Sequence, residues 1–222
     1  MKIKIIGADA AFDGLNTSFY FRDDSGRGVL VDCGFTVFPE LNRLGMLNDI
    51  DVCLISHPHA DHTGSLTKLA AWNSIMKQQK LIVGGHEWIP ELFRVQGIAP
   101  DNYIPLSDDD SLNLKMIKND HIRAHGYNNA LYIADKILYS GDTDENLLLT
   151  EYAQGAKIIF HEAMIRKTDV HITLDELATA PAEIKAKTWI VHVPTNERAE
   201  MTRMAAEYGF AGVCYNGQEI EI

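Results

Sequence analysis

The sequence predicts an α/β protein built as an αββα sandwich, in which helices flank two mixed β-sheets. Near both ends of the 222-residue chain, apolar strand-like runs alternate with amphipathic segments of helical period. Between them lies a series of short alternating segments that is typical of antiparallel strands. Such an order of elements indicates two packed sheets with helices on their outer faces. No Gly/Ser/Pro-rich linker or internal repeat divides the chain, so residues 1–222 are expected to form one domain.

The first half of the chain supplies strands and helices in alternation. Apolar or alternating runs predict strands at residues 2–7, 17–21, 28–32, 51–56 and 80–83. Apolar side chains at helical spacing predict helices at residues 35–44, 63–76 and 87–96. Gly45 marks the end of the first helix, and Pro90 suits the first turn of the third.

The second half begins with β-structure and returns to alternation. Strands are predicted at residues 112–117, 121–125, 130–134, 137–140, 157–161, 188–192, 212–215 and 218–222. Helices are predicted at residues 145–153, after the Thr173–Glu176 capping box, and at 195–208 between Thr195 and Gly209.

The composition limits the partners and the location. A formal net charge of −11 weighs against a large polyanionic partner, because Lys and Arg supply most affinity for a phosphate backbone. A small phosphorylated substrate remains compatible, since bound divalent cations reverse the local potential. The chain shows no signal-peptide core or apolar run of membrane-spanning length, and its three scattered cysteines suit a reduced state. These features predict a cytoplasmic protein.

Ligand-type side chains are densest in the segment Ser56-His57-Pro58-His59-Ala60-Asp61-His62, directly after an apolar strand. His57 and His59 can point the same way from an extended turn, while Asp61 and His62 can face a second point nearby. The pattern therefore predicts two adjacent metal ions, which lie roughly 3.5–4 Å apart in two-metal sites. Nitrogen and oxygen ligands without cysteine suit Zn²⁺ and also permit Mn²⁺ or Fe²⁺.

Ligand-type residues recur at three other predicted strand ends. They are Asp142 in the run Ser140-Gly141-Asp142-Thr143, the pair His161-Glu162, and His192. Functional sites are commonly built from strand ends and the loops that follow them. We expect these residues to converge on the histidine-rich segment.

The motif His57-Pro58-His59-Ala60-Asp61-His62 resembles the H-x-H-x-D-H signature of the metallo-β-lactamase fold superfamily. The run Tyr139-Ser140-Gly141-Asp142-Thr143 is similar to the strand-end aspartate motif of the same superfamily. His161-Glu162-Ala163 and His171-Ile172-Thr173 look like the ribonuclease Z branch. The resemblance covers nearly the whole chain.

The resemblance implies a set of metal ligands and catalytic residues. One ion would be held by His57, His59 and a third histidine, and the other by Asp61, His62 and His192, with Asp142 bridging. For the third histidine both His121 and His125 are available, and His125 is favoured because it shortly precedes a turn into an aromatic-containing strand. Asp61 would also orient the water made nucleophilic by the metals, and His171, held by Glu162, would be the general acid. Alternatively, Glu162 and His171 only orient ligands.

One departure from ribonuclease Z concerns the substrate. That family inserts a tRNA-gripping arm between the third histidine and the bridging aspartate, but only 17 residues (142 − 125) separate His125 from Asp142 here. The chain therefore resembles compact ribonuclease Z-like cyclic-nucleotide phosphodiesterases, including phage proteins of the anti-Pycsar type. The implied function is two-metal hydrolysis of a small phosphodiester, most simply a cyclic mononucleotide. The alternatives are a ribonuclease Z-like RNA endonuclease, a lactonase or β-lactamase-type hydrolase, and a non-catalytic nucleotide-binding protein.

Partner contacts are the least specified part of this interpretation. The resemblance implies a homodimer, and the region from Trp88 to Tyr103 could form its interface. The loop Tyr127-Asn128-Asn129 is a candidate for substrate contact because it follows the third histidine. Several aromatic residues, Phe12 among them, could stack on a base, but core or ordinary surface positions are favoured for each.

Overall fold

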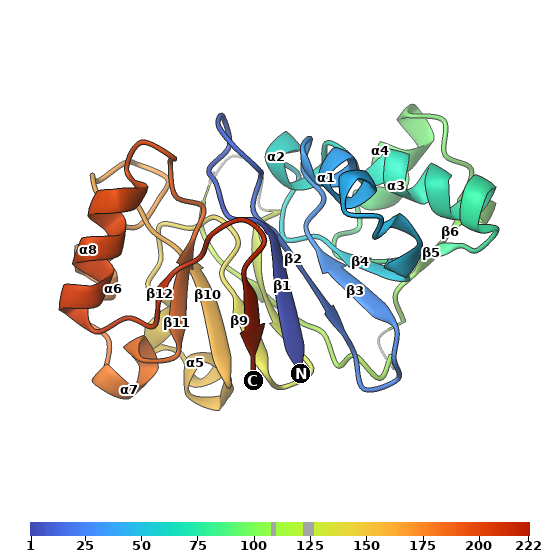
Figure 1. The fold of residues 1–222 in the computed structure, drawn as a ribbon. Helices are drawn as coiled ribbons and strands as arrows, with labels where there is room; N and C mark the ends of the chain where they lie inside the picture. Colours follow the sequence, from blue (N-terminus) through green and yellow to red (C-terminus); the bar gives the residue numbers. More distant parts are fainter. Residues whose placement is uncertain (108–109, 122–126) are drawn as a thin grey trace.

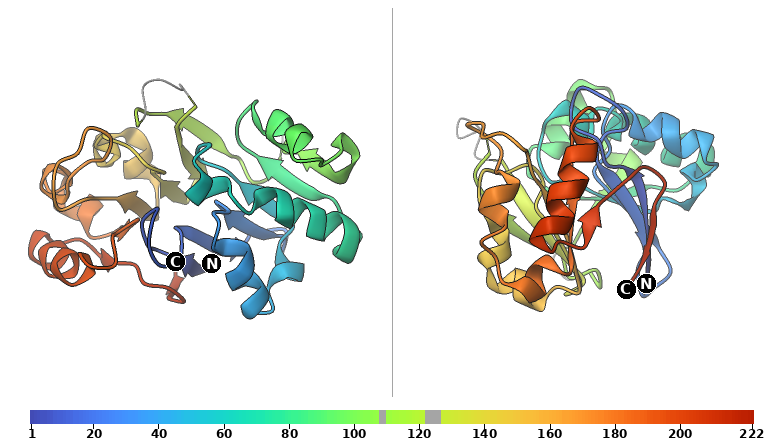
Figure 2. Two further views of the ribbon diagram at one scale, coloured as in Figure 1. Left: turned by 90° about the horizontal axis from the view of Figure 1, so that it is seen from above. Right: turned by 60° about the vertical axis from the view of Figure 1, so that its left-hand side comes forward.

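The computed structural model describes residues 1–107, 110–121 and 127–222 and confirms the predicted sandwich. Two β-sheets face each other, and helices cover the outer face of each sheet (Figure 1). The two chain ends lie side by side, since the Met1 amino group donates a hydrogen bond to the Ile222 carbonyl over 2.6 Å (Figure 2).

The first sheet has the strand order β13-β1-β2-β3-β4-β5-β6. Neighbours from β13 to β3 are antiparallel, and those from β3 to β6 are parallel, so the sheet is mixed. Its strands are β1 (Lys2–Gly7), β2 (Ser18–Arg22), β3 (Gly28–Val31), β4 (Val52–Leu54), β5 (Leu81–Gly84), β6 (Tyr103–Pro105) and β13 (Glu219–Glu221).

The second sheet has the strand order β12-β11-β10-β9-β8-β7. It is parallel from β12 to β9 and antiparallel from β9 to β7. Its strands are β7 (Lys115–Lys118), β8 (Asn129–Ile133), β9 (Ile137–Tyr139), β10 (Ile158–Glu162), β11 (Thr188–Val191) and β12 (Gly212–Val213). Because β9, β10 and β11 run parallel, the residues that follow them lie at one edge of this sheet.

Helices complete the outer layers. The first sheet is covered by α1 (Val37–Arg43), α3 (Leu66–Trp72) and α4 (Ile89–Val95), and α2 (Ala60–Thr63) follows the histidine segment. The second sheet carries α5 (Glu151–Gly155), α6 (Leu174–Leu177), α7 (Ala182–Lys185) and α8 (Arg198–Tyr208). Short turns are the 3₁₀ helices η1 (Leu47–Asp49), η3 (Pro100–Asn102) and η4 (Leu147–Leu149), and the π-helix η2 (Asn73–Lys77).

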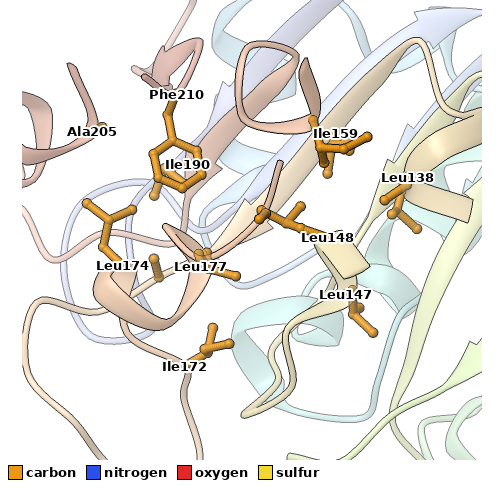
Figure 3. Close-up of a cluster of buried hydrophobic side chains, with 14 of the residues drawn as sticks. Leu138, Leu147, Leu148, Ile159, Ile172, Leu174, Leu177, Ile190, Ala205 and Phe210 are labelled. Atoms are coloured by element: carbon orange, nitrogen blue, oxygen red, sulfur yellow. The ribbon is translucent and has the colours of Figure 1, made fainter. Parts of the chain in front are cut away.

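The apolar core forms three layers that hold the sandwich together. Rings of Phe19, Tyr139 and Phe160 pack between the sheets, with Phe19 and Phe160 centroids 4.7 Å apart. A second cluster lies between the first sheet and its helices. The third joins α6 and α8 to β10 and β11, where Leu177, Ile190 and Phe210 meet (Figure 3).

Two helices differ between the prediction and the structure: one is divided into shorter helices, and the other begins at a later residue. The helix expected over residues 63–76 is split into α2, α3 and η2, because Ser65 donates its backbone N–H to the Cys33 carbonyl and its hydroxyl to the Phe35 carbonyl. The last long helix begins at Arg198 rather than at Thr195, whose N–H and hydroxyl both donate to the Asp13 carboxylate instead. In both places a tertiary contact replaces the local helix signal.

Candidate metal centre

Two groups of buried ligand-type side chains meet where the carboxyl ends of the strands converge. The first group is His57, His59, His121 and Asp142. The second group is Asp61, His62, Asp142 and His192. Within each group the ligand atoms lie within 4.8 Å of one another, and Asp142 belongs to both.

The distances inside these groups fit shared metal ions better than hydrogen bonds. Asp142 Oδ2 lies 3.8 Å from His57 Nε2, 3.8 Å from His121 Nε2 and 3.4 Å from His192 Nε2. Asp142 Oδ1 lies 3.3 Å from His62 Nε2. Two ligands that bind one zinc ion tetrahedrally at 2.0–2.2 Å stand about 3.4 Å apart. The observed separations cluster around that value.

Four buried ligand atoms find no hydrogen-bond partner in the described part of the chain. They are His57 Nε2, His62 Nε2, Asp61 Oδ2 and Asp142 Oδ1. An unpaired buried polar atom costs about 1–3 kcal/mol, so four at one point would be a heavy penalty for a purely structural cluster. Divalent cations would satisfy all four, and the donor set therefore fits the metals that the sequence predicts.

The outer ring nitrogens of two motif histidines are held by neighbouring side chains. His62 Nδ1 lies 2.7 Å from the Asp32 carboxylate, which can only accept. His57 Nδ1 lies 3.0 Å from Ser56 Oγ, whose own proton is donated to Asp32. Each ring therefore carries its proton on Nδ1 and presents the lone pair of Nε2 to the centre, which is the arrangement of a metal-binding histidine.

The two remaining buried histidines of the groups are oriented in the same way. His121 Nδ1 donates to the Val170 carbonyl over 2.7 Å. His192 Nδ1 lies 3.4 Å from Thr17 Oγ, whose proton is donated to the Asp9 carbonyl. Their Nε2 atoms are thus also available as ligands.

Glu162 and His171 form a third group of ligand-type side chains with His121, beside the other two. Glu162 Oε2 lies 2.7 Å from His171 Nδ1, and its Oε1 accepts the backbone N–H of Thr143. Burial raises the pKa of Glu162 well above its usual range and lowers that of His171. Desolvation thus opposes the protonated form of His171 that a general acid requires. His171 is the more exposed member of the pair and lines the cavity over the centre.

A family profile described as "Anti-Pycsar protein Apyc1" matches residues 1–90 and 84–220. The chain belongs to this family. Among its curated members, the Apyc1 protein of Paenibacillus harenae is 28% identical over 218 residues, which covers 86% of this chain and 89% of that protein. The Apyc1 protein of Bacillus phage 010DV004 is 26% identical and covers 93% of this chain and 96% of its own.

Solved structures confirm the fold of this Apyc1-family chain. The metallo-β-lactamase fold protein YhfI from Bacillus subtilis superposes with a TM-score of 0.77 at 19% identity, over 100% of this chain and 99% of its own. The short form of human tRNase Z superposes with a TM-score of 0.70 at 16% identity, over 100% and 99% of the two chains. Family membership and the paired ligand groups together identify the chain as a metal-dependent hydrolase. The described part of the chain contains no helix that could span a membrane.

Asp32 is a buried residue beside the ligand groups that the sequence interpretation missed. It follows β3 with a left-handed backbone (φ 56°) and is fully buried. Its carboxylate accepts hydrogen bonds from Ser56 N, Ser56 Oγ and Tyr139 Oη, at 2.8, 2.8 and 2.9 Å, in addition to the ring of His62. Asp32 also ends an apolar strand, so the strand-end signal that found Asp142 could have found it too.

Replacing Asp32 by Asn should weaken metal binding about 10- to 100-fold, the usual cost of losing a group that orients a ligand. An amide offers one acceptor oxygen and turns its NH₂ group toward at least one of the four donors, so the His62 and His57 rings lose their fixed orientation. Metal titration by calorimetry measures the effect. Asp135→Asn is the matched control, because Asp135 also has a positive φ (52°) but is exposed. Unchanged affinity in Asp32→Asn would contradict this role.

The third histidine of the first group is His121 among the described residues. The favoured candidate of the sequence interpretation, His125, lies outside the described residues, so that preference stays a prediction. His121 sits at a bend after β7 rather than in a strand, and its ring centroid lies 5.0 Å from that of His59. Its hydrogen bond to Val170, 49 residues away, could not be expected from local sequence.

The three residues of the loop proposed for substrate contact, 127–129, make different contacts. Asn128 is buried and donates to the carbonyl of Asp142 over 2.6 Å, so it supports the shared ligand. Asn129 donates to His86 Nδ1 over 3.2 Å, and His86 Nε2 donates to the Ser56 carbonyl over 2.6 Å. Tyr127 is exposed beside His59. His86 thus braces the strand end that carries the histidine motif.

Burial and neighbouring charges shift the pKa values of the ligand-type residues in different directions. Although burial opposes the shift, the carboxylates of Asp142 and Asp32 raise the pKa of His62. Burial likewise opposes the shift of Asp142, whose pKa is lowered by the neighbouring rings of His192 and His62. Burial lowers the pKa of His57 and of His192. Burial also lowers the pKa of His161 to about 4, and this ring bonds to the Glu162 carbonyl outside both ligand groups.

Proposed function

We propose that the protein is a phosphodiesterase that hydrolyses a cyclic mononucleotide with two divalent metal ions. The observation that carries the proposal is the pair of four-residue ligand groups that share Asp142. One ion would be held by His57, His59, His121 and Asp142, and the other by Asp61, His62, Asp142 and His192. Zn²⁺ suits this nitrogen and oxygen set, and Mn²⁺ or Fe²⁺ is also compatible with it.

Metal ions and protein side chains would have different roles in the reaction. Bound divalent ions would supply positive charge to the phosphoryl oxygens and make water nucleophilic near neutral pH. Asp61, whose Oδ2 lies unpaired at the centre, would orient that water and accept its proton. His171, held through Nδ1 by Glu162, would present Nε2 toward the cavity and donate a proton to the departing ribose oxygen.

Three features of the chain favour a small substrate over a long nucleic acid. The cavity over the ligand groups has a volume of about 390 Å³, which falls within the range of small-molecule sites. Between residue 127 and Asp142 the described chain forms only the β8–β9 hairpin, with no inserted arm. A net charge of −11 adds a further penalty for a polyanion. The names of the curated relatives, anti-Pycsar proteins, agree with a nucleotide signal as substrate.

Incubation of the pure protein with Zn²⁺ or Mn²⁺ and cyclic CMP, UMP, AMP or GMP tests the proposal. We expect conversion to the linear nucleoside monophosphate, which chromatography detects. Turnover should be lost after chelation of the metal and should recover when metal is added. A fluorogenic lactone and a single-stranded RNA serve as competing substrates. Turnover of either one without turnover of any cyclic nucleotide would refute the proposal.

The assembly state is a separate proposal that follows from the superfamily resemblance. We propose a homodimer, with the face of α4 near Trp88 as the candidate contact. The exposed side chain of Val95 on α4 is consistent with such a role. Sedimentation velocity of the wild-type protein measures the mass directly, and a monomer at micromolar concentration would contradict it.

A further inference from the structure

Two phenyl rings stand exposed at the mouth of the metal centre. Phe12, in the loop between β1 and β2, is fully exposed at 102%, and Phe35, between β3 and α1, is 59% exposed. Both line the cavity that also contains His59, Asp61 and His171. The β1–β2 loop rises at the same end of the sandwich as α2, which follows the histidine motif (Figure 1). Large exposed apolar side chains beside a cavity commonly mark a binding surface.

The exposed position of Phe12 is not the result of a loosely held loop. Before it, Asp9 accepts hydrogen bonds from Leu15 N over 2.7 Å and from Asn216 Nδ2 over 2.8 Å, and forms an ion pair with Arg198. After it, Asp13 accepts two hydrogen bonds from Thr195, three residues before α8 begins at Arg198. The backbone on both sides is therefore tied to the C-terminal part of the chain while the ring remains in solvent.

Phe35 is also held in place, and its loop is joined to that of Phe12. A Cβ at Gly64 would collide with the Phe35 ring, so the ring rests against glycine backbone, and Ser65 Oγ donates to the Phe35 carbonyl over 2.9 Å. Asn16 and Thr36 exchange three hydrogen bonds of 2.7 to 3.1 Å between the two loops. The two rings therefore belong to one braced rim.

We propose that Phe12, assisted by Phe35, binds the nucleobase of the substrate by ring stacking while the ribose phosphate lies on the metal centre. The inference rests on the proposed nucleotide substrate. It follows from the two kinds of side chain that line the cavity. The ligand-type residues gather at the metal centre. The other described lining side chains are apolar, namely Ala11, Phe12, Phe35, Ala60 and Val170. A nucleotide matches this division, because its phosphate is anionic and its base has apolar faces.

The chemistry of this rim also predicts how bases are distinguished. Stacking on an aromatic ring accepts any base, because every base has a π-face. The apolar lining side chains carry no hydrogen-bonding group that could read a base edge. We therefore expect purine and pyrimidine cyclic nucleotides to depend on Phe12 to a similar extent, and selectivity between them to be small.

Binding measurements on Phe12→Ala test the inference without requiring turnover. Calorimetry compares AMP with ribose 5-phosphate, which has the same sugar phosphate but no base, on the metal-loaded protein. We expect wild-type protein to bind AMP about 10-fold or more tightly than ribose 5-phosphate, because one base–aromatic stack corresponds to roughly 5- to 150-fold in affinity. Phe12→Ala should remove most of that difference, and Phe12→Trp should keep it.

The same variants are then assayed with cyclic AMP and cyclic CMP. Phe12→Ala should raise KM about 10-fold for both while kcat changes less than about 3-fold, since the ring contacts only the base. Ile75→Ala is the matched control, because Ile75 is 70% exposed but does not line the cavity. It should behave like wild type in both experiments.

Defined results would overturn the inference independently of the proposed function. Equal wild-type affinity for AMP and ribose 5-phosphate would show that no base site exists. Unchanged AMP affinity in Phe12→Ala together with an altered sedimentation coefficient would show that the ring contacts a second copy of the chain instead. By contrast, absence of cyclic-nucleotide turnover in wild type, with the AMP preference intact and dependent on Phe12, would refute the proposed reaction but support the base site.

Discussion

Asp142→Asn should lower kcat/KM for the cyclic-nucleotide substrate by about 10³-fold or more. Among the described residues, Asp142 is the one side chain that belongs to both ligand groups, and it lies 3.3 to 3.8 Å from four histidine Nε2 atoms. An amide has the same size but no negative charge, so neither ion would keep its shared anionic ligand. Metal ions contribute several kcal/mol of transition-state stabilisation, and about 4 kcal/mol corresponds to 10³-fold. Initial rates and metal content are measured on the same preparation.

Asp144→Asn provides the control for the Asp142 substitution. Asp144 lies two residues later in the same loop, only partly buried and outside both ligand groups. The same chemical change there should leave kcat/KM within about 3-fold of wild type, as is usual for substitutions away from a site. If Asp142→Asn retained both its metal and its activity, the shared-ligand arrangement would be refuted.

His171→Ala should reduce kcat on a cyclic nucleotide by about 10²- to 10⁴-fold, the contribution typical of a positioned general acid. The expected loss depends on the leaving group, because a ribose alkoxide needs a proton and a nitrophenolate does not. On a nitrophenyl ester of a nucleoside monophosphate the loss should be less than about 10-fold. Parallel assays with the two substrates measure the difference directly.

The alternative role of His171, orienting ligands only, predicts a different pattern. Both substrates would then lose activity equally, and metal affinity would fall about 10- to 100-fold. Asp169→Ala is the control, since Asp169 is an exposed neighbour in the same loop. Equal losses on the two substrates with weakened metal binding would assign Glu162 and His171 to ligand support rather than to proton transfer.

Much of the fold and of the metal centre could be predicted from the sequence because the signals are local. The segment His57–His62 begins just after Ile55 and Ser56, which follow β4, so a short stretch of backbone carries several ligand types in a defined order. Asp142 and His192 follow parallel strands, and this arrangement brings strand ends to one edge. The same reasoning failed for the helix expected at residues 63–76, where Ser65 bonds to Cys33 and Phe35 instead.

The remaining parts of the site depend on contacts between distant residues. His121 is oriented by Val170, and Asp32 gathers donors from Ser56, His62 and Tyr139 across β3, β4 and β9. No periodicity or spacing encodes such pairs, since each partner is an ordinary residue in its own segment.

The sequence by itself therefore predicted the αββα class and most of the residues that the structure gathers into the two ligand groups, because residue type and strand-end position are local properties. Only the tertiary structure decided how the rings are oriented: Nδ1 of His57, His62 and His121 is held by Ser56, Asp32 and Val170, so that Nε2 of each ring faces the ligand groups. It also placed Phe12 at the mouth of the cavity, where sequence reasoning had favoured a core or ordinary surface position. The physical reason is that orientation and exposure arise from packing among elements that are distant along the chain.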